Sequence, residues 1–394
     1  MILKYAMKYL KFNQKRKISY GRQYISNEDI QSVKKSLNSD MITQGAYVDL
    51  FENKLRNYFK SKYSLVVSNG TAALHLAMLS LNLSSKDTVV TSPLSFLASA
   101  NCVEYVGAKV DFCDIEKTSY TLDPNKLEDK LKKKNIKAVI VVDYAGHPAD
   151  WESFYFLKKK YKFVLVNDNC HALGSKLNND KAYSSKFADI VTQSFHPVKQ
   201  ITTGEGGAII TNNKKIYSKC LLLRNHGIKR NKEKWWSYSM SELGFNYRIS
   251  DINCALGSSQ ISRLSKIIKR KREIAQLYNK KIKNDFLQLP VEKQNVYHSY
   301  HLYPLLIDFK KLKISKDSFI QEMSKKDITL QVHYKPIHLQ NYYKNKYGFK
   351  KNDFKIAENF YSKEVSLPIY YGLKTKDQIK VIKTMDSILK KIRI

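Results

Sequence analysis

The sequence predicts an α/β protein whose large lobe is built on a mainly parallel or mixed sheet and whose smaller C-terminal lobe is α+β. Three observations lead to this prediction. Short runs of β-forming residues alternate with helical patterns from Ile18 onward. The chain has 394 residues, enough to bury a large core in two lobes. Its hydrophobic content of 43% is that of a folded protein, and no apolar run is long enough to cross a bilayer.

The first helices follow a basic N-terminal extension, residues 1–17. The extension alternates apolar and basic residues, and it is interpreted either as a plain extension or as a short helix on an anionic membrane surface. A helix is expected over Asn27–Leu37, capped by Ser26 or Asn27, and another over Tyr47–Phe59. Thr43-Gln44-Gly45 forms the turn between them.

A third helix has a start that suits an anion. Ser68-Asn69-Gly70-Thr71 leads directly into the strong helical run Ala72–Leu79. The first N–H groups of a helix are unpaired and lie at the positive end of its dipole, so they can bind a phosphate. An ordinary N-cap explains the same pattern more simply.

Strands are expected over Thr88–Thr91, Ala108–Cys113, Ala138–Asp143 and Phe163–Val166. Phe96 follows the first of them, before a helix over Leu97–Val106, and it would either stack on a planar ring or belong to the core. Asp168 and His171 follow the last. An acid at the carboxyl end of a buried strand is usually functional or paired, because an unpaired carboxylate there is costly to desolvate.

Lys199 lies on an irregular loop between two more strands, Asp189–Gln193 and Ala208–Thr211. Proline and three glycines interrupt the loop, so the backbone can approach a ligand closely. In a chain this rich in lysine, a single lysine on a loop is usually solvated. A catalytic role for Lys199 is therefore supported only by the residues expected around it.

These features share one edge of the predicted sheet, because the carboxyl ends of parallel strands meet there. Together they supply a phosphate cradle at Gly70-Thr71, an aromatic plate, an acid and an amine. Pyridoxal phosphate requires this set: a lysine for the Schiff base, a carboxylate that keeps the pyridine nitrogen protonated, and N–H groups for the phosphate.

Composition argues against other classes. The net charge of +34 is spread along the whole chain and accompanies no nucleic-acid-binding motif, so it suits an anionic substrate or a nearby anionic membrane better than nucleic acid. The five cysteines are scattered, which predicts reduced thiols in a cytoplasmic protein. The histidine pairs 298/301 and 333/338 lack further ligands, so no metal site is expected.

Six segments carry a resemblance to a known family. They are SNGTAALHLA (68–77), SFHPVKQITTGEGGAI (194–209), ELGFNYRISDINCALG (242–257), HSYHLYP (298–304), VHYKPIHLQNYY (332–343) and SLPIY (366–370). In this order they resemble the DegT/StrS-type nucleotide-sugar aminotransferases, which have the fold type I of aspartate aminotransferase. The similarity extends from Ile18 almost to the C-terminus.

The resemblance implies a homodimeric pyridoxal phosphate enzyme with shared active sites. Lys199 would form the Schiff base and carry a proton, and Asp168 would pair with the pyridine nitrogen. The other implied cofactor contacts are Thr71, Ala72 and Ser194 at the phosphate, Phe96 on the ring, His171 near the phenolic oxygen, and Asn246 and Arg248 supplied by the partner chain. The implied substrate contacts are Thr43, Gln44, His333, Tyr334 and His338.

Within the family, the TQG turn, SFHPVKQITTGEGG and VHYKPIHLQ are similar to members that move an amino group from L-glutamate to the C4 ketone of a UDP-linked 4-keto-6-deoxy-N-acetylhexosamine. The implied product is UDP-4-amino-4,6-dideoxy-N-acetyl-β-L-altrosamine, a step towards pseudaminic acid. Another nucleotide-linked keto sugar, of the bacillosamine type or dTDP-linked, is the alternative. Sugar dehydration is a further one, opposed by Lys199. Ala46 and Asn167 depart from the family, which usually has a proline and an acid there.

The expected division is an extension (1–17), a large pyridoxal-phosphate-binding domain (18–265) and a small C-terminal domain (266–394). Ser250–Lys283 is expected to be a long helical link between the two domains, with apolar residues at helical spacing. Its basic run, Lys266–Arg272, is interpreted as a solvated face.

Overall fold

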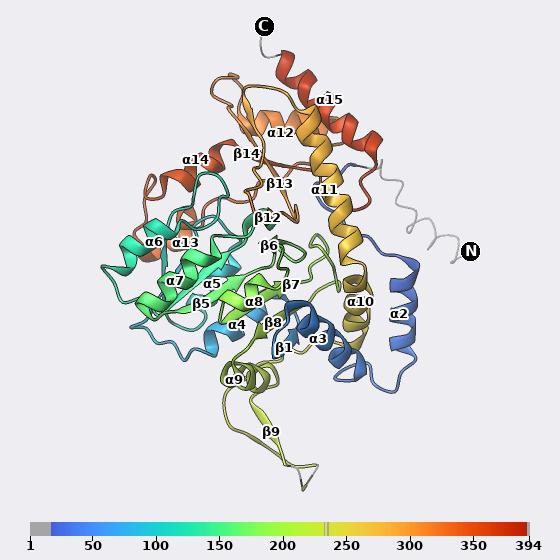
Figure 1. Ribbon diagram of the computed structural model, residues 1–394, viewed down its shortest axis with the longest axis vertical. Coiled ribbons are helices and arrows are strands. Elements are labelled where there is room, and N and C mark those ends of the chain that lie inside the picture. The colour runs from blue at the N-terminus through green and yellow to red at the C-terminus, as the bar shows by residue number, and fades with distance from the viewer. Residues whose placement is uncertain (1–16, 232, 235, 392–394) are drawn as a thin grey trace, which may run out of the picture.

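A computed structural model describes residues 17–231, 233–234 and 236–391 (Figure 1). All but the last residue of the predicted basic extension therefore lies outside the described residues. None of the described helices is both long and apolar enough to span a membrane.

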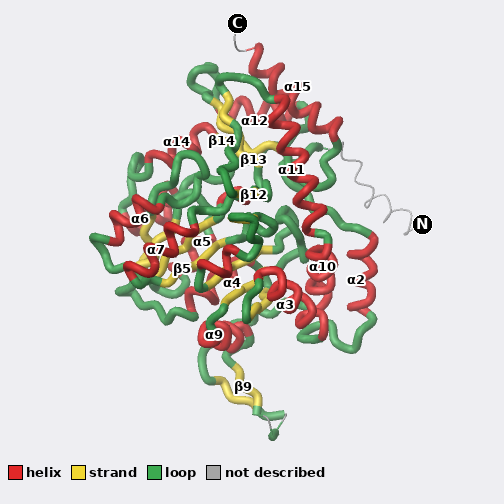
Figure 2. The backbone as a smooth tube through the Cα atoms, viewed as in Figure 1, coloured by secondary structure: helices red, strands yellow, loops and turns green. Residues whose placement is uncertain are grey.

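A seven-stranded mixed sheet forms the centre of the large lobe (Figure 2). β8 runs antiparallel to both neighbours, β1 and β7, whereas the pairs from β7 to β3 are parallel. The order across the sheet is β1 (Tyr63–Val67), β8 (Gly207–Thr211), β7 (Ile190–Ser194), β5 (Val164–Asp168), β4 (Ala138–Val142), β2 (Thr88–Thr91) and β3 (Lys109–Phe112). The predicted mainly parallel, mixed sheet is confirmed.

Helices cover both faces of this sheet, because successive side chains of a strand point to opposite sides. Val89 of β2 packs into a core shared with α4 (Gly70–Leu79), α5 (Ala98–Glu104) and α9 (Lys214–Arg224). Its neighbour Val90 packs into the opposite core, shared with α6 (Pro124–Leu131), α7 (Trp151–Tyr161) and α8 (Tyr183–Phe187). This two-sided burial explains why the strands are continuous apolar runs.

The N-terminal helices α2 (Asn27–Leu37) and α3 (Ala46–Phe59) both pack on α10 (Asp251–Ser262). Ser26 caps α2 as part of a reciprocal capping box with Asp29. Asp251, the first residue of α10, is fully buried and accepts the N–H groups of Gly45 at 2.8 Å and Tyr47 at 2.9 Å. One carboxylate thus fixes the turn that carries Thr43 and Gln44.

The predicted helical link over Ser250–Lys283 consists of two consecutive helices, α10 and α11 (Leu264–Lys281). Arg263 ends α10 with non-helical backbone angles, and its side chain pairs with Asp29 of α2. The interpretation of Lys266–Arg272 as a solvated face is wrong for Lys271, which is buried.

The C-terminal part has its own sheet of three antiparallel strands and its own core, at the top of Figure 1. The strand order is β11 (Leu287–Gln288), β13 (Tyr303–Ile307) and β14 (Glu364–Leu367). α11, α12 (Lys316–Lys325) and α15 (Thr375–Lys391) pack together. The remaining elements are the short pair β6 (Lys176–Leu177) and β12 (Val296–Tyr297), the 3₁₀ turns η1 (Tyr144–Gly146) and η2 (Ile337–Leu339), and α13 (Asn341–Tyr347) and α14 (Lys355–Lys363).

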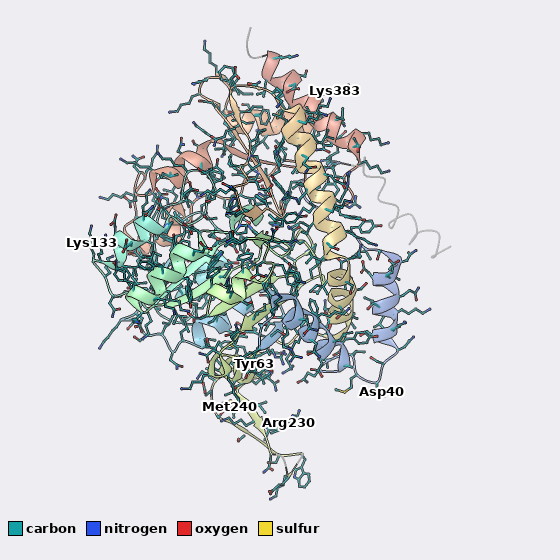
Figure 3. The ribbon with its side chains drawn as sticks, in the orientation of Figure 1. Asp40, Tyr63, Lys133, Arg230, Met240 and Lys383 are labelled. Atoms are coloured by element: carbon teal, nitrogen blue, oxygen red, sulfur yellow. The ribbon has the colours of Figure 1, made fainter. Side chains whose placement is uncertain are left out.

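A hairpin of β9 (Ile228–Arg230) and β10 (Tyr238–Met240) extends away from the body of the molecule, below α9 in Figure 1. Figure 3 labels Arg230 and Met240 on it, and it also places Lys133 and Lys383 at separate outer edges of the molecule. Positive charge is therefore found at widely separated places on the surface.

Candidate active site

A cavity of about 970 Å³ lies at the carboxyl ends of the parallel strands. The segments that follow β1, β2, β5 and β7 line the cavity, together with residues 301 and 331–334 of the C-terminal part. The structure brings together nine of the predicted site residues there: Thr71, Ala72, Phe96, Asp168, His171, Ser194, Lys199, His333 and Tyr334. The volume of the cavity is large enough for a ligand of the size of a cofactor.

Lys199 presents its amine to this cavity from the loop between β7 and β8. Burial lowers the pKa of the Lys199 ammonium, although the negative charge of Cys170 and Asp168 would raise it. A lowered pKa leaves more of the amine neutral, and only the neutral amine is a nucleophile.

Asp168 lies at the end of β5 in the same cavity and is only 6% exposed. Its Oδ2 accepts a hydrogen bond of 2.6 Å from the Ser99 hydroxyl, and its Oδ1 accepts one of 3.3 Å from the Cys170 N–H. Ser95 is 2.7 Å from the Ser99 oxygen and continues this chain to the cavity wall. The carboxylate is therefore held in one orientation. Sequence reasoning missed both serines.

A buried network fixes the strand ends beside Asp168. Asp143, at the end of β4, accepts hydrogen bonds from Asn167 Nδ2 at 3.0 Å and Asn169 Nδ2 at 2.7 Å. Its other donors are the Ala149 N–H, the Trp151 indole N–H and the Tyr183 hydroxyl. Burial raises the pKa of Asp143, whereas these hydrogen bonds lower it. Asn167, the departure from the family, donates to Asp143, which a carboxylate there could not do.

His171 is a neutral imidazole in the cavity wall. Burial, followed by the positive charge of Lys199, lowers its pKa well below the usual value. The Ala145 N–H donates to its Nδ1 at 3.3 Å, so the single ring proton lies on Nε2, which is 3.2 Å from the Tyr334 hydroxyl. This arrangement presents a fixed donor rather than a charge.

The start of α4 and the end of β7 form a narrow cradle. A Cβ atom added to Gly70 would lie 2.7 Å from the Cβ of Ser194, and one added to Gly207 would lie 2.4 Å from the Asn69 carbonyl oxygen. Only glycine permits these approaches. The first N–H groups of α4, at Gly70 and Thr71, have no acceptor within the helix. The Ala72 N–H instead donates to Asn69 Oδ1 at 2.8 Å, so the N-cap already uses it.

These groups fit pyridoxal phosphate. The cradle suits its phosphate, Lys199 can attach its carbonyl carbon, and Asp168 can pair with its ring nitrogen. Phe96 is 56% exposed and stands at the cavity wall near Tyr334, which excludes the alternative that it belongs to the core.

Lys271 is a second buried lysine behind the cavity, and sequence reasoning missed it. From α11 its Nζ donates to Gln200 Oε1 at 2.8 Å and to the His301 carbonyl at 3.3 Å. No carboxylate in the described part of the chain forms an ion pair with it. Burial, with a contribution from Lys199, lowers the pKa of Lys271 to about 7. Through its hydrogen bonds to Gln200 and His301, Lys271 connects the Lys199 loop to the C-terminal part.

This buried amine predicts a pH-dependent stability. In the unfolded chain Lys271 titrates at about 10.4, so between pH 7 and 10 the unfolded state binds more protons and the free energy of unfolding rises with pH. Lys271→Met should remove this rise, which is on the order of a few kcal/mol. Urea unfolding at several pH values measures it. Lys269→Met, at an exposed position of the same helix, is the control. Parallel pH curves for wild type and Lys271→Met would contradict the assignment.

Five predicted site residues do not line the cavity. Thr43 and Gln44 are exposed on the turn before α3. His338 is fully buried, and its Nε2 lies 3.1 Å from Glu358, so the structure gives it a packing role beside α14. Asn246 and Arg248 lie on the segment that follows the hairpin. Asn246 is exposed, and Arg248 donates a hydrogen bond to Asn225, which precedes the hairpin.

Known aminotransferases resemble this chain in sequence and in fold. Over 379 residues the chain is 40% identical to the UDP-4-amino-4,6-dideoxy-N-acetyl-beta-L-altrosamine transaminase of Campylobacter jejuni subsp. jejuni serotype O:23/36 (strain 81-176), covering 95% of this chain and 98% of the relative. The structure of Helicobacter pylori PseC, an aminotransferase involved in the biosynthesis of pseudoaminic acid, matches with a TM-score of 0.88 and 31% identity, covering 95% of this chain and all of PseC (100%).

The pyridoxal phosphate form of the putative sugar aminotransferase Spr1654 from Streptococcus pneumoniae also has a TM-score of 0.88, at 26% identity, covering 96% of this chain and 100% of that one. The sequence profile of the DegT/DnrJ/EryC1/StrS aminotransferase family matches residues 23–386. The fold type I prediction is confirmed. The chain is a pyridoxal-phosphate-dependent aminotransferase and belongs to the DegT/DnrJ/EryC1/StrS family.

Proposed function

We propose that this enzyme transfers the amino group of L-glutamate to the C4 ketone of a UDP-linked 4-keto-6-deoxy-N-acetylhexosamine, giving UDP-4-amino-4,6-dideoxy-N-acetyl-β-L-altrosamine. The observation that carries the reaction class is the placement of the Lys199 amine and the Asp168 carboxylate in one cavity. The named relatives support the choice of sugar. Lys199 also argues against sugar dehydration, in which this position is typically a histidine.

The residues divide the work between them. Bound pyridoxal phosphate supplies an electron-accepting ring and a carbon that carries the amino group. Lys199 Nζ would hold the cofactor, and the same amine would carry the proton at the reacting substrate carbon. Asp168, which is oriented by the Ser99 hydroxyl, would keep the pyridine nitrogen protonated. His171 carries its ring proton on Nε2, beside the Tyr334 hydroxyl, and Phe96 would pack on the cofactor ring.

A panel of acceptors tests the substrate. The loaded enzyme is incubated with L-glutamate and UDP-, GDP- or dTDP-linked 4-keto sugars, and NMR identifies the amino sugar and its C4 configuration. We expect turnover with the UDP-linked N-acetyl sugar and the β-L-altro product. Preferential use of a GDP- or dTDP-linked sugar, or the other C4 configuration, would support the alternative, another nucleotide-linked keto sugar.

The proposal includes a homodimer in which each chain completes its partner's site. Asn246 and Arg248 do not line the cavity of their own chain. β10 of the hairpin and the segment after it expose large apolar side chains: Tyr238 is 65% exposed, Met240 63% and Leu243 80%. Such a projecting apolar surface fits a partner, and a second copy of the chain is the partner we propose.

Mixed dimers test the sharing of sites. A dimer of one Lys199→Ala chain and one Arg248→Ala chain, purified through two different tags, should have about half of wild-type activity. Both defects then fall in one site, which leaves the other intact.

The matched control carries the same two substitutions on one chain, paired with a wild-type chain. With shared sites, each of its two sites has one defect, and activity should be low. If each chain instead formed a complete site alone, the two mixed dimers would exchange their behaviour.

We propose four further properties. The five free cysteines support a cytoplasmic location. We retain the domain limits 18–265 and 266–394. Weak membrane contact through residues 1–17 is also retained, and no nucleic acid partner is proposed.

A further inference from the structure

A buried carboxyl group lies behind His333, one of the residues in the cavity wall. Glu364 begins β14 and is fully buried, and Ser366, two residues further on, lies on the same side of the strand. The Ser366 hydroxyl donates to Glu364 Oε1 at 2.6 Å, and the His333 N–H donates to Glu364 Oε2 at 2.9 Å. His333 Nδ1 lies 2.8 Å from the Ser366 oxygen. The three residues therefore form a closed set of hydrogen bonds.

The surroundings leave one group in this set to titrate near neutral pH. Burial raises the pKa of Glu364 to about 8, although its hydrogen bonds and Lys316 of α12 lower it. Burial, with Lys199 across the cavity, lowers the pKa of His333 to about 3. Lys316 itself donates to the Tyr361 carbonyl, and Glu364 forms no ion pair within the described ranges. His333 therefore stays neutral while Glu364 changes charge.

The other contacts of His333 fix its position. The Tyr144 hydroxyl donates to its carbonyl oxygen, and the Tyr20 ring packs on the imidazole with the ring centroids 5.2 Å apart. Both of those rings are neutral near pH 8. Among the described residues, none forms a hydrogen bond with Nε2 of His333, and the imidazole lines the cavity. Nε2 is thus the nitrogen left for a ligand.

The charge of Glu364 decides which nitrogen carries the imidazole proton. When Glu364 is ionised, the Ser366 hydroxyl donates to it, His333 Nδ1–H donates to Ser366, and Nε2 is a bare acceptor. When Glu364 takes up a proton on Oε1, this proton is donated to Ser366, the Ser366 hydroxyl is donated to Nδ1, and the imidazole proton lies on Nε2. The imidazole keeps one proton throughout, and the net change is the proton gained by Glu364.

We propose that Glu364 and Ser366 are positioning residues that set the tautomer of His333, so that its cavity-facing nitrogen is a hydrogen-bond donor when Glu364 is protonated and an acceptor when it is ionised. At neutral pH His333 then offers Nε2–H to an acceptor atom of the sugar nucleotide, such as a keto or phosphate oxygen. This use of the donor rests on the proposed function, whereas the relay itself is a property of the protein alone.

Glu364→Gln tests the relay, because glutamine imitates the protonated acid. Its carbonyl accepts the His333 N–H and its amide donates to Ser366, which locks the proton on Nε2. In the ¹⁵N-histidine-labelled holoenzyme, NMR should show His333 changing from the Nε2–H to the Nδ1–H tautomer with a midpoint near pH 8. His333→Asn assigns the signal. In Glu364→Gln the Nε2–H tautomer should persist at all pH values.

Glu358→Gln is the matched control, because Glu358 also pairs with a histidine, His338, but away from the cavity. It should leave the His333 transition unchanged. Ser366→Ala breaks the relay at its middle and should also remove the transition. A wild-type His333 that keeps one tautomer from pH 6.5 to 9.5, or a Glu364→Gln enzyme that still switches, would overturn the proposal.

Substrate affinity provides a second readout. The affinity of the wild type for the UDP-linked sugar should fall about tenfold between pH 7 and 9.5, as one hydrogen bond is lost, and the affinity of Glu364→Gln should show no such step. An NMR transition without the step in affinity would show that the relay works but that His333 does not donate to the sugar. Failure of the proposed sugar in the acceptor panel leaves the NMR result unaffected.

Discussion

The Lys199→Ala enzyme is expected to complete no measurable catalytic cycles with glutamate and a keto sugar, while it keeps its fold. The substitution removes the amine that attaches the cofactor and carries the proton, and we expect the rate to fall by at least roughly 10⁴-fold. The side chain ends in the cavity rather than in a packed core, so the thermal unfolding midpoint of the apoenzyme should change little.

Borohydride reduction of the loaded enzyme checks the assignment. Peptide mapping should find the cofactor fixed to Lys199 in the wild type and no specific label in Lys199→Ala. Lys271 is the important comparison, because it is also buried and its pKa is also lowered. Label on Lys271, or repeated turnover by Lys199→Ala without added amine, would show that the wrong lysine has been assigned.

Asp168→Asn is expected to lower the rate by on the order of a hundredfold or more, even with cofactor bound. Asparagine keeps the shape and can still accept the Ser99 hydroxyl, but it has no charge to hold a proton at the pyridine nitrogen. Steady-state kinetics at saturating cofactor, together with the cofactor content and absorbance spectrum, measure the effect.

Asp143→Asn is the control, because Asp143 lies at the end of the neighbouring strand and does not line the cavity. We expect it to lower the unfolding midpoint by disturbing a network of five donors, while activity per folded site stays near the wild-type value. Near-normal turnover by Asp168→Asn, or equal catalytic losses in both variants, would argue against the role of Asp168.

The sheet and most of the cavity could be predicted because their causes are local. Apolar runs mark buried strands, and the chemistry follows each strand at its carboxyl end, so Asp168 and Lys199 could be placed on one edge without coordinates. The helix bounds near Asn27 and Tyr47 were within one residue for the same reason, since caps and apolar spacing lie in the segment itself.

The residues that were missed act through long-range contacts. Lys271 sits in a basic run typical of a solvated surface, and only the packing of α11 against the Lys199 loop buries it. Ser99 and Ser366 are small polar residues whose importance comes from the carboxylates beside them. Arg263, between α10 and α11, pairs with Asp29, more than two hundred residues earlier. No pattern within a single segment carries this information.

The single carboxylate of Asp251 also determines how the turn that carries Thr43 and Gln44 is ordered. A proline at position 46, which the family resemblance leads us to expect, would restrict the unfolded chain. Ala46 does not restrict the unfolded chain in this way. The hydrogen bonds of Asp251 to Gly45 and Tyr47 instead offset the conformational entropy that the turn loses on folding. The turn that carries Thr43 and Gln44 is therefore held by contacts with α10 rather than by a proline ring.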